Sequence, residues 1–297
     1  MKNISFDLSG KIEKPVVGAL YTLQKVAGSL GIPLFVVGAS ARDFILRHHC
    51  GMEPRRKTGD IDLGVEVANW EQFKTLFESL ISTGQFSPTP EKQRLRCGTI
   101  LIDILPFGAI SDKDKKISWP PGHEIIMSMV GFEEAYEHSI TVRVSSDPDL
   151  DIKLASLPGL AIMKLISWKE KYPDRKRDAE DLLLMMNKYE EAGNSERLYG
   201  EDLPLLQEEG FDTRLAGTRL LGRDMAIISD QKTFLVVKEI LDAETEEMGQ
   251  YKLATDMMRE AGMSDTRFDE MLAQLMKLRH GFVENGKEPK IRKSRSK

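Results

Sequence analysis

The chain has 297 residues, of which 41% are hydrophobic and 30% are charged. This length suits one large domain or two ordinary ones, and the composition excludes a disordered chain. No apolar run approaches the roughly eighteen residues of a transmembrane helix, and charges interrupt the N-terminal stretch that a secretory signal would need. Two cysteines cannot frame a disulfide scaffold, and five scattered histidines give no zinc-ligand spacing. We therefore expect a soluble cytoplasmic protein that does not contact membranes.

The formal net charge of −5 is unevenly distributed along the chain. Residues 287–297 contain six basic residues and one acid, so this tail carries +5 and the remainder carries −10. An acidic body argues against a broad duplex-DNA footprint. The basic tail either contacts RNA or another polyanion, or forms a disordered, solubilising end.

The first half of the sequence changes its hydrophobic period often, which is typical of alternating helices and strands. Helical spacing occurs in the segments Val16–Leu30, Ser40–His48 and Trp70–Ile81, the last with Asn69 as a candidate N-cap. Strand-like runs occur in the segments Leu34–Val37, Asp60–Val67, Arg94–Arg96, Thr99–Leu105 and Ile140–Val144. We interpret residues 1–155 as one α/β domain.

From Pro158 onward the period is helical throughout. The expected helices are Gly159–Lys171, Arg177–Glu191, Asp202–Glu209, Asp212–Asp224, Gln231–Glu246, Gln250–Ala261 and Asp265–Leu278, with Asp230 and Ser264 as N-caps. The predicted organisation is an α+β protein, with a helical domain over residues 156–285 and a basic disordered tail over residues 286–297.

The segment Asp60-Ile61-Asp62 is the most informative one for chemistry. On a strand, residues two apart share a face, so both carboxylates point the same way. Two carboxylates that are two residues apart on one face of a strand repel each other unless a cation lies between them. Oxygen ligands of this kind suit Mg²⁺ or Mn²⁺. Alone, the pair could also be a strand edge that leaves a polar loop.

A further carboxylate, Asp103, lies in the middle of the apolar run Leu101–Leu105. Burying it is costly without a partner or a metal. One interpretation makes it the third ligand of a two-metal phosphoryl-transfer site with Asp60 and Asp62. The alternative is a core aspartate that is satisfied by backbone donors, Arg94 or Arg96.

A small-residue turn joins the strand Leu34–Val37 to the following helix. Its backbone N–H groups could bind a phosphate, while Ser40 could add a hydroxyl and Arg42 a charge. Tight packing is the alternative explanation for Gly38, Ala39 and Ser40 at this position.

Together these motifs resemble the DNA polymerase beta-type nucleotidyltransferase superfamily. The resemblance rests on Val-Gly-Ala-Ser-Ala-Arg-Asp from Val37 to Asp43, on Asp60-Ile61-Asp62 and on Asp103. The tract Ile102–Gly108 and the helical region Lys164–Leu182 look most like the AbiEii/AbiGii-type nucleotidyltransferase toxin family. The resemblance covers residues 34–185 and implies a nucleotidyltransferase-type mixed sheet with flanking helices, followed by an all-helical domain.

The resemblance also implies a role for each motif. Gly38 and Ser40 would contact the triphosphate, Asp60 and Asp62 would bind Mg²⁺, and Asp103 would be a metal ligand or base. Ala39 stands where the superfamily usually has a second glycine or a serine, and its methyl could hinder close approach to phosphates.

The interval from Gly38 to Asp60 is longer than the superfamily usually has, and the basic loop Arg55-Arg56-Lys57 could account for the insertion. This loop could meet triphosphate or an acceptor nucleic acid, or it could be a solvated surface loop.

Lys164 lies within an apolar helical segment, and Asp178 and Asp181 share a face of the next one. In the resembling family, such a lysine and such an Asp-x-x-Asp helix lie beside the nucleotide. Lys164 would then neutralise triphosphate charge, and Asp178 would position it or the acceptor. A structural ion pair between the two helices is the alternative.

These features predict a Mg²⁺-dependent nucleotidyltransferase that moves an NMP from an NTP to an acceptor hydroxyl of RNA (tRNA included) or protein. One alternative is a tRNA CCA-adding or poly(A) polymerase-like enzyme, although no Glu-Asp-x-x-Arg helix supports it. Another is a non-catalytic nucleotide-binding module of a toxin–antitoxin pair, which would imply an antitoxin partner.

Overall fold

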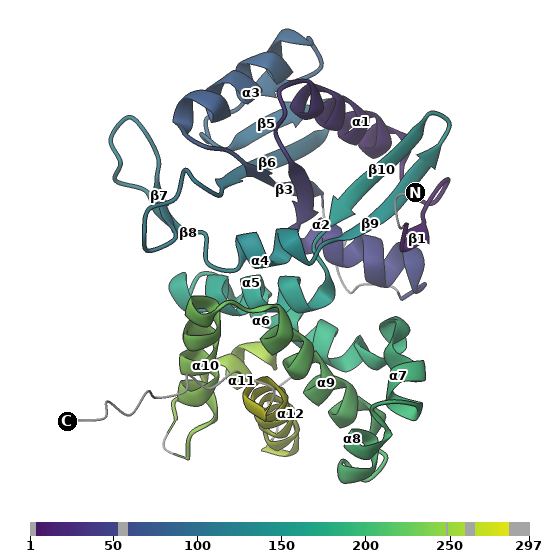
Figure 1. Ribbon diagram of the computed structural model, residues 1–297. Coiled ribbons are helices and arrows are strands. Elements are labelled where there is room, and N and C mark those ends of the chain that lie inside the picture. The colour runs from purple at the N-terminus through teal and green to yellow at the C-terminus, as the bar shows by residue number, and fades with distance from the viewer. Residues whose placement is uncertain (1–3, 53–58, 248, 259–264, 285–297) are drawn as a thin grey trace, which may run out of the picture.

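The computed structural model describes residues 4–52, 59–247, 249–258 and 265–284. Within these residues, the first part of the chain forms an eight-stranded mixed sheet with the strand order β1-β9-β10-β2-β3-β6-β5-β4 (Figure 1). In that order the strands are Phe6–Asp7, Ile140–Ser146, Asp149–Leu154, Leu34–Val37, Asp60–Glu66, Ile100–Phe107, Arg94–Cys97 and Ser87–Pro88. A separate pair joins β7 (Lys116–Ser118) to β8 (Ile126–Ser128).

The parallel strands β3 and β6 lie at the centre of the sheet and place Asp62 directly opposite Asp103. β2 runs antiparallel to β3 on one side, and β5 runs antiparallel to β6 on the other. Ile61 and Leu63 are buried in the core. Because successive side chains alternate between the faces of a strand, Asp60 and Asp62 share the opposite face.

Helices pack on both sides of this sheet. They are α1 (Lys14–Ser29), α2 (Gly38–Asp43) with its π-helical continuation η1 (Phe44–His49), α3 (Trp70–Ser82) and α4 (Phe132–Glu137). Figure 1 shows α1 and α3 on the side away from the helical part of the chain, whereas α4 lies toward it. The backbone N–H of Gln72 donates to Asn69 at 2.9 Å, which confirms the predicted cap of α3.

All described elements after β10 are helical. They are α5 (Leu157–Glu170), α6 (Lys176–Lys188), η2 (Glu190–Asn194), α7 (Ser195–Tyr199), α8 (Leu203–Glu208), α9 (Thr213–Ile228), α10 (Gln231–Thr245), α11 (Lys252–Met257) and α12 (Asp265–Glu284). Glycines let α9 and α12 approach closely, since a Cβ on Gly222 would lie 2.2 Å from the Leu278 carbonyl oxygen. Among the described residues, no helix is both long and apolar enough to span a bilayer.

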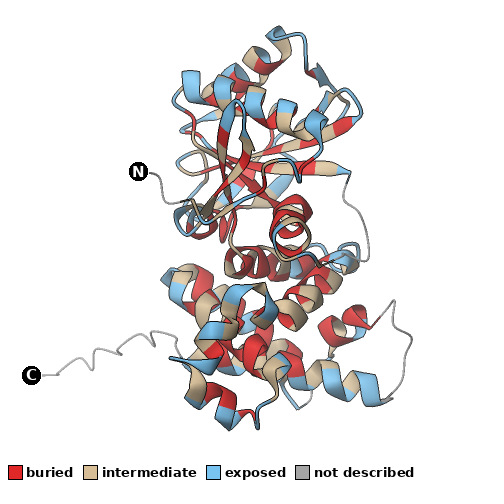
Figure 2. Ribbon diagram, turned by 90° about the vertical axis from the view of Figure 1, so that its right-hand side faces the viewer, coloured by how far each residue is buried: buried red, intermediate tan, exposed pale blue. Residues whose placement is uncertain are grey.

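The helix α5 connects the sheet to the helical part and is buried on most of its surface (Figure 2). Its apolar residues belong to one continuous core that includes both parts of the chain. The indole Nε1 of Trp168 in α5 donates to Asp256 of α11 at 2.9 Å, with both side chains buried. A helix that is apolar all round is expected where packing occurs on several sides.

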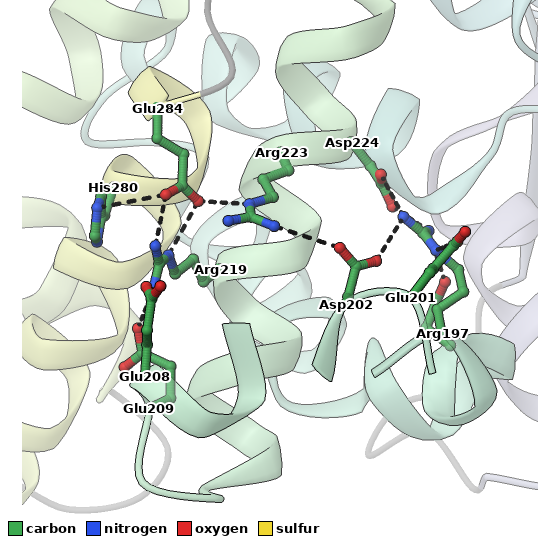
Figure 3. A network of polar contacts seen from close by, with 11 residues as sticks. Arg197, Glu201, Asp202, Glu208, Glu209, Arg219, Arg223, Asp224, His280 and Glu284 are labelled. Carbon is green, nitrogen blue, oxygen red and sulfur yellow. Dashed lines mark hydrogen bonds and ion pairs between the residues drawn. The ribbon is translucent and has the colours of Figure 1, made fainter. Parts of the chain in front are cut away.

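A network of ion pairs links α8, α9 and α12 in the helical part (Figure 3). Arg219 is buried and contacts Glu208 and Glu209 through Nη1, and Glu284 through Nε and Nη2. Arg223 reaches the same Glu284 carboxylate at 2.6 Å. This network joins the C-terminal turn of α12 to the middle of α9.

The structure confirms the predicted mixed sheet followed by a helical region. Asp230 caps α10 as predicted, because its side chain accepts from the Thr233 N–H at 2.7 Å. The prediction missed α4 and β10, whose apolar Leu150, Ile152 and Leu154 alternate with polar residues. The basic loop 55–57, Ser264 and the tail 286–297 lie outside the described residues, and the domain limits remain a prediction.

Candidate active site

Three carboxylates gather on the central strands of the sheet. The register of β3 and β6 brings Asp62 beside Asp103, and Asp60 shares their face at the start of β3. The side chain of Asp60 is 46% exposed and that of Asp103 is 14% exposed. The structure thus brings together the three acids that the sequence singled out.

The turn after β2 lies directly against Asp62. Gly38 has φ of +65°, and a Cβ at this position would lie 2.1 Å from Oδ2 of Asp62. Only a residue without a side chain can therefore occupy position 38 while Asp62 keeps its place. The small-residue turn and the carboxylate pair are consequently parts of one continuous surface.

The next residues of the turn are largely inaccessible. Ala39 is 7% exposed and Ser40 is 6% exposed. The Ser40 hydroxyl donates to the backbone carbonyl of Asp60 at 2.5 Å, so it anchors the start of β3. In this arrangement Ser40 supports the carboxylate strand, whereas the prediction made it a phosphate contact.

Among the described residues, Arg42 forms no ion pair with Asp60, Asp62 or Asp103. It is 3% exposed, and its guanidinium donates to Asp43 through Nε at 2.8 Å and to Asp181 of α6 through Nη1. This buried pair fastens α2 to α6. The structure therefore gives Arg42 a packing role in place of the predicted nucleotide contact.

The acidity of Asp62 is strongly altered by its surroundings. Burial raises the pKa of Asp62 to about 6; the charge of Lys164 opposes this rise, and Asp103 and Asp60 add to it. A carboxylate in such a position gains from any cation that approaches it.

Asp62 and Gly38 line a pocket of about 150 Å³ whose opposite wall comes from α5 and the start of α6. Lys164 and Asp178 also line it, so the structure brings both residues to the same pocket as Asp62. The Lys164 ammonium donates to Asp178 at 2.7 Å and lies 2.7 Å from Asp181. Burial alone would lower the pKa of Lys164, but the nearby carboxylates of Asp181 and Asp178 raise it by more. The net pKa lies above the usual value of a lysine, so the side chain is charged.

Both interpretations of Lys164 are compatible with this geometry, because it forms the structural ion pair and also borders the pocket. Its partner Asp178 is 2% exposed, and the second oxygen of that carboxylate is buried with no hydrogen-bond partner in the part of the chain that is described.

Two cations at the pocket were missed by the sequence prediction. Lys171 and Arg175 lie in the connection between α5 and α6 and line the same pocket as Asp62. Both are exposed, and neither has an ion-pair partner within the described ranges. The signal that could have revealed Arg175 is the run of basic residues, Arg175 to Arg177, that directly precedes Asp178.

Asp60 and Asp62 offer the hard oxygen donors that Mg²⁺ or Mn²⁺ prefers. Asp103 differs, because Arg94 of β5 donates to both of its oxygens, each at 2.7 Å. No described group of three or more acids, histidines or cysteines is arranged to hold a metal. The pair at 60 and 62 thus fits a divalent ion, while Asp103 has the arginine partner that the alternative interpretation named.

No family model and no curated protein matches the chain. Solved structures that the chain matches include the antibiotic-resistance factor ANT(2'')-Ia in solution, at 13% identity over 67% of this chain and 99% of that chain, with a TM-score of 0.34. ANT(2'')-Ia with adenylyl-2''-tobramycin matches at 15% identity over 68% and 96% of the two chains, with a TM-score of 0.33. The Thermotoga maritima CCA-adding enzyme with tRNA matches at 14% identity over 93% and 83%, with a TM-score of 0.27.

Proposed function

We propose that this protein is a nucleotidyltransferase that moves an NMP from an NTP to an acceptor hydroxyl, on an RNA 3′ end or on a protein. The observation that carries the proposal is the contact between Gly38 and Asp62, which joins a strand-to-helix turn to a carboxylate pair. Such a pair beside a pocket that Lys164, Lys171 and Arg175 help to line would combine metal binding with charge neutralisation of a polyphosphate. The narrower resemblance to AbiEii/AbiGii-type toxins, with an antitoxin partner, belongs to this proposal.

In this proposal the acceptor oxygen forms a bond to the α-phosphorus, the bond to the β-phosphate oxygen breaks, and pyrophosphate leaves with the electron pair. The hydroxyl proton passes to water. Asp60 and Asp62 would hold Mg²⁺ or Mn²⁺, which supplies charge neutralisation at the phosphates when bound. Lys164 adds a fixed positive charge to the pocket wall, and Asp178 orients that lysine.

The test is transfer of label from each of the four α-labelled NTPs, with Mg²⁺ or Mn²⁺ and with total RNA present or absent. The control is the variant Asp60→Asn/Asp62→Asn, checked for folding by circular dichroism. Label on RNA or protein that requires both aspartates would support the proposal and identify the acceptor. Absence of both transfer and NTP binding under every condition would overturn it.

A second candidate is a non-catalytic nucleotide-binding module. The observation that favours it is that Arg94 donates hydrogen bonds to both carboxylate oxygens of Asp103. NTP binding without transfer in the same experiment would establish this candidate. A CCA-adding or poly(A) polymerase-like activity would instead give label from CTP or ATP on tRNA or RNA 3′ ends.

We expect Lys171 and Arg175 to bind the β- and γ-phosphates, because they are the unpaired cations described at the pocket. The variant Lys171→Ala/Arg175→Ala should weaken NTP binding by about tenfold or more, since hydrogen bonds to charged groups contribute about 1.5–3 kcal/mol each. NMP binding should change little. The matched control is Lys169→Ala, which removes an exposed charge of α5 that does not line the pocket. Fluorescence titration with NTP and NMP would measure both affinities, and equal losses for NTP and NMP would contradict the assignment.

A further inference from the structure

Arg94 is placed to act on the carboxylate cluster from the neighbouring strand. The antiparallel register of β5 and β6 sets Arg94 directly opposite Asp103. Its Nε and Nη2 atoms reach the two oxygens of that carboxylate at 2.7 Å each. The same Nη2 lies 3.8 Å from Oδ2 of Asp60. One guanidinium therefore bridges the first and third acids of the cluster.

The geometry of this contact is that of a stable pair. A planar guanidinium that donates two parallel hydrogen bonds to one carboxylate is fixed in orientation as well as in position. The side chains of Arg94 and Asp103 are 23% and 14% exposed, so solvent screens the pair only partly. The Asp103 carboxylate raises the pKa of Arg94 through these hydrogen bonds, and the arginine stays charged.

Other cations near the cluster do not contact Asp103 in this way. Lys164 is engaged by Asp178 and Asp181 on the far wall of the pocket. Arg175 acts on Asp62 through its charge, without a hydrogen bond in the described structure. Among the described residues, Arg94 is thus the cation that directly contacts Asp103.

We propose that Arg94 takes the place of a second metal ion, so that the site binds one divalent cation at Asp60 and Asp62. The guanidinium supplies the positive charge that Asp103 would otherwise obtain from a metal. This inference rests on the proposed function for its purpose, but the number of bound ions can be measured without any transfer reaction.

The experiment is a titration of the nucleotide-free full-length protein with Mn²⁺, in which electron paramagnetic resonance counts free and bound ions. The wild type should bind one ion, and Asp103→Asn should leave this count unchanged. Arg94→Ala should gain a second site that binds at least about tenfold more tightly than any second ion in the wild type, because two carboxylates then face each other without a counter-charge. Asp103→Asn in the Arg94→Ala background should remove that second site.

The matched control is Arg96→Ala, which removes an exposed arginine from the same strand and should not alter the count. If Arg94→Ala does not fold, the comparison of wild type with Asp103→Asn still tests the inference. A wild type that binds two ions and loses one in Asp103→Asn would overturn it. So would an Arg94→Ala protein with an unchanged count, or a wild type that binds no ion. None of these results depends on whether NMP transfer is observed.

Discussion

Gly38→Ala should reduce NMP transfer by at least about 100-fold, because a small displacement of a reacting or metal-binding group can have an effect of that size. The added methyl would lie 2.1 Å from Oδ2 and 2.8 Å from Cγ of Asp62, so the carboxylate must move. Asp62 sits on a central strand with buried neighbours on either side, and a shift there disturbs the whole carboxylate cluster.

The matched control for this substitution is Gly31→Ala. Gly31 has nearly the same φ, +66° against +65°, but nothing lies within 4 Å of the place that an added methyl would occupy. Both variants carry the cost of a left-handed alanine, about 1–2 kcal/mol. Only Gly38→Ala should lose transfer, measured as steady-state kcat/KM beside the unfolding free energy. Equal activity losses in the two variants would mean that backbone strain, and not the contact with Asp62, matters at position 38.

Arg219→Met should destabilise the protein by about 1–3 kcal/mol, because the buried carboxylate of Glu209 loses a hydrogen-bond donor. Lys277, 2.6 Å from Glu209, still balances its charge, so the loss stays below that of an unpaired buried charge. The side chains of Arg219 and Glu209 are 5% and 3% exposed, so water has little access to replace the lost hydrogen bond. Arg223→Met is the control, since its side chain is 25% exposed and an accessible pair contributes at most about 1 kcal/mol. Urea denaturation of the two variants and the wild type would compare these costs, and equal losses of stability would contradict the prediction.

The same network makes stability depend on pH in the acidic range. Burial opposes ionisation of Glu284, but hydrogen bonds from Arg219 and Arg223 lower its pKa from 4.5 to about 2. A depressed carboxylate contributes stability above its unfolded pKa, and that contribution disappears as the pH falls from about 4.5 to about 2. We expect Arg219→Met to show a shallower loss over this window. An unchanged slope would mean that Glu284 is not the group responsible.

The local signals of the sequence predicted the centre of the fold well. A short apolar run located β2, alternation located β3, and the apolar run around Asp103 located β6. The caps at Asn69 and Asp230 began their helices as expected. These features depend on residues that are adjacent along the chain, where hydrophobic period and capping chemistry determine the structure.

The features that the sequence did not predict depend on residues that are distant along the chain. Arg42 follows a phosphate-type turn, yet its partner Asp181 lies 139 positions away. Arg94 was only one of several possible partners for Asp103 until the register of β5 and β6 selected it. Lys171 and Arg175 line the same pocket as Asp62 because α5 and α6 lie next to the sheet (Figure 1). No local hydrophobic period encodes that arrangement of the two helices.

The buried position of α5 limits how the chain can be rearranged as modules. This helix supplies Lys164 to the pocket, and its Trp168 is hydrogen-bonded to Asp256 within the helical part. If the helical part, α5 included, were exchanged for that of another protein, the new part would supply its own wall of the pocket. Under the proposed function, nucleotide affinity and acceptor choice would consequently be inherited together. A chimaera with its junction after α5 would break the contact between Trp168 and Asp256.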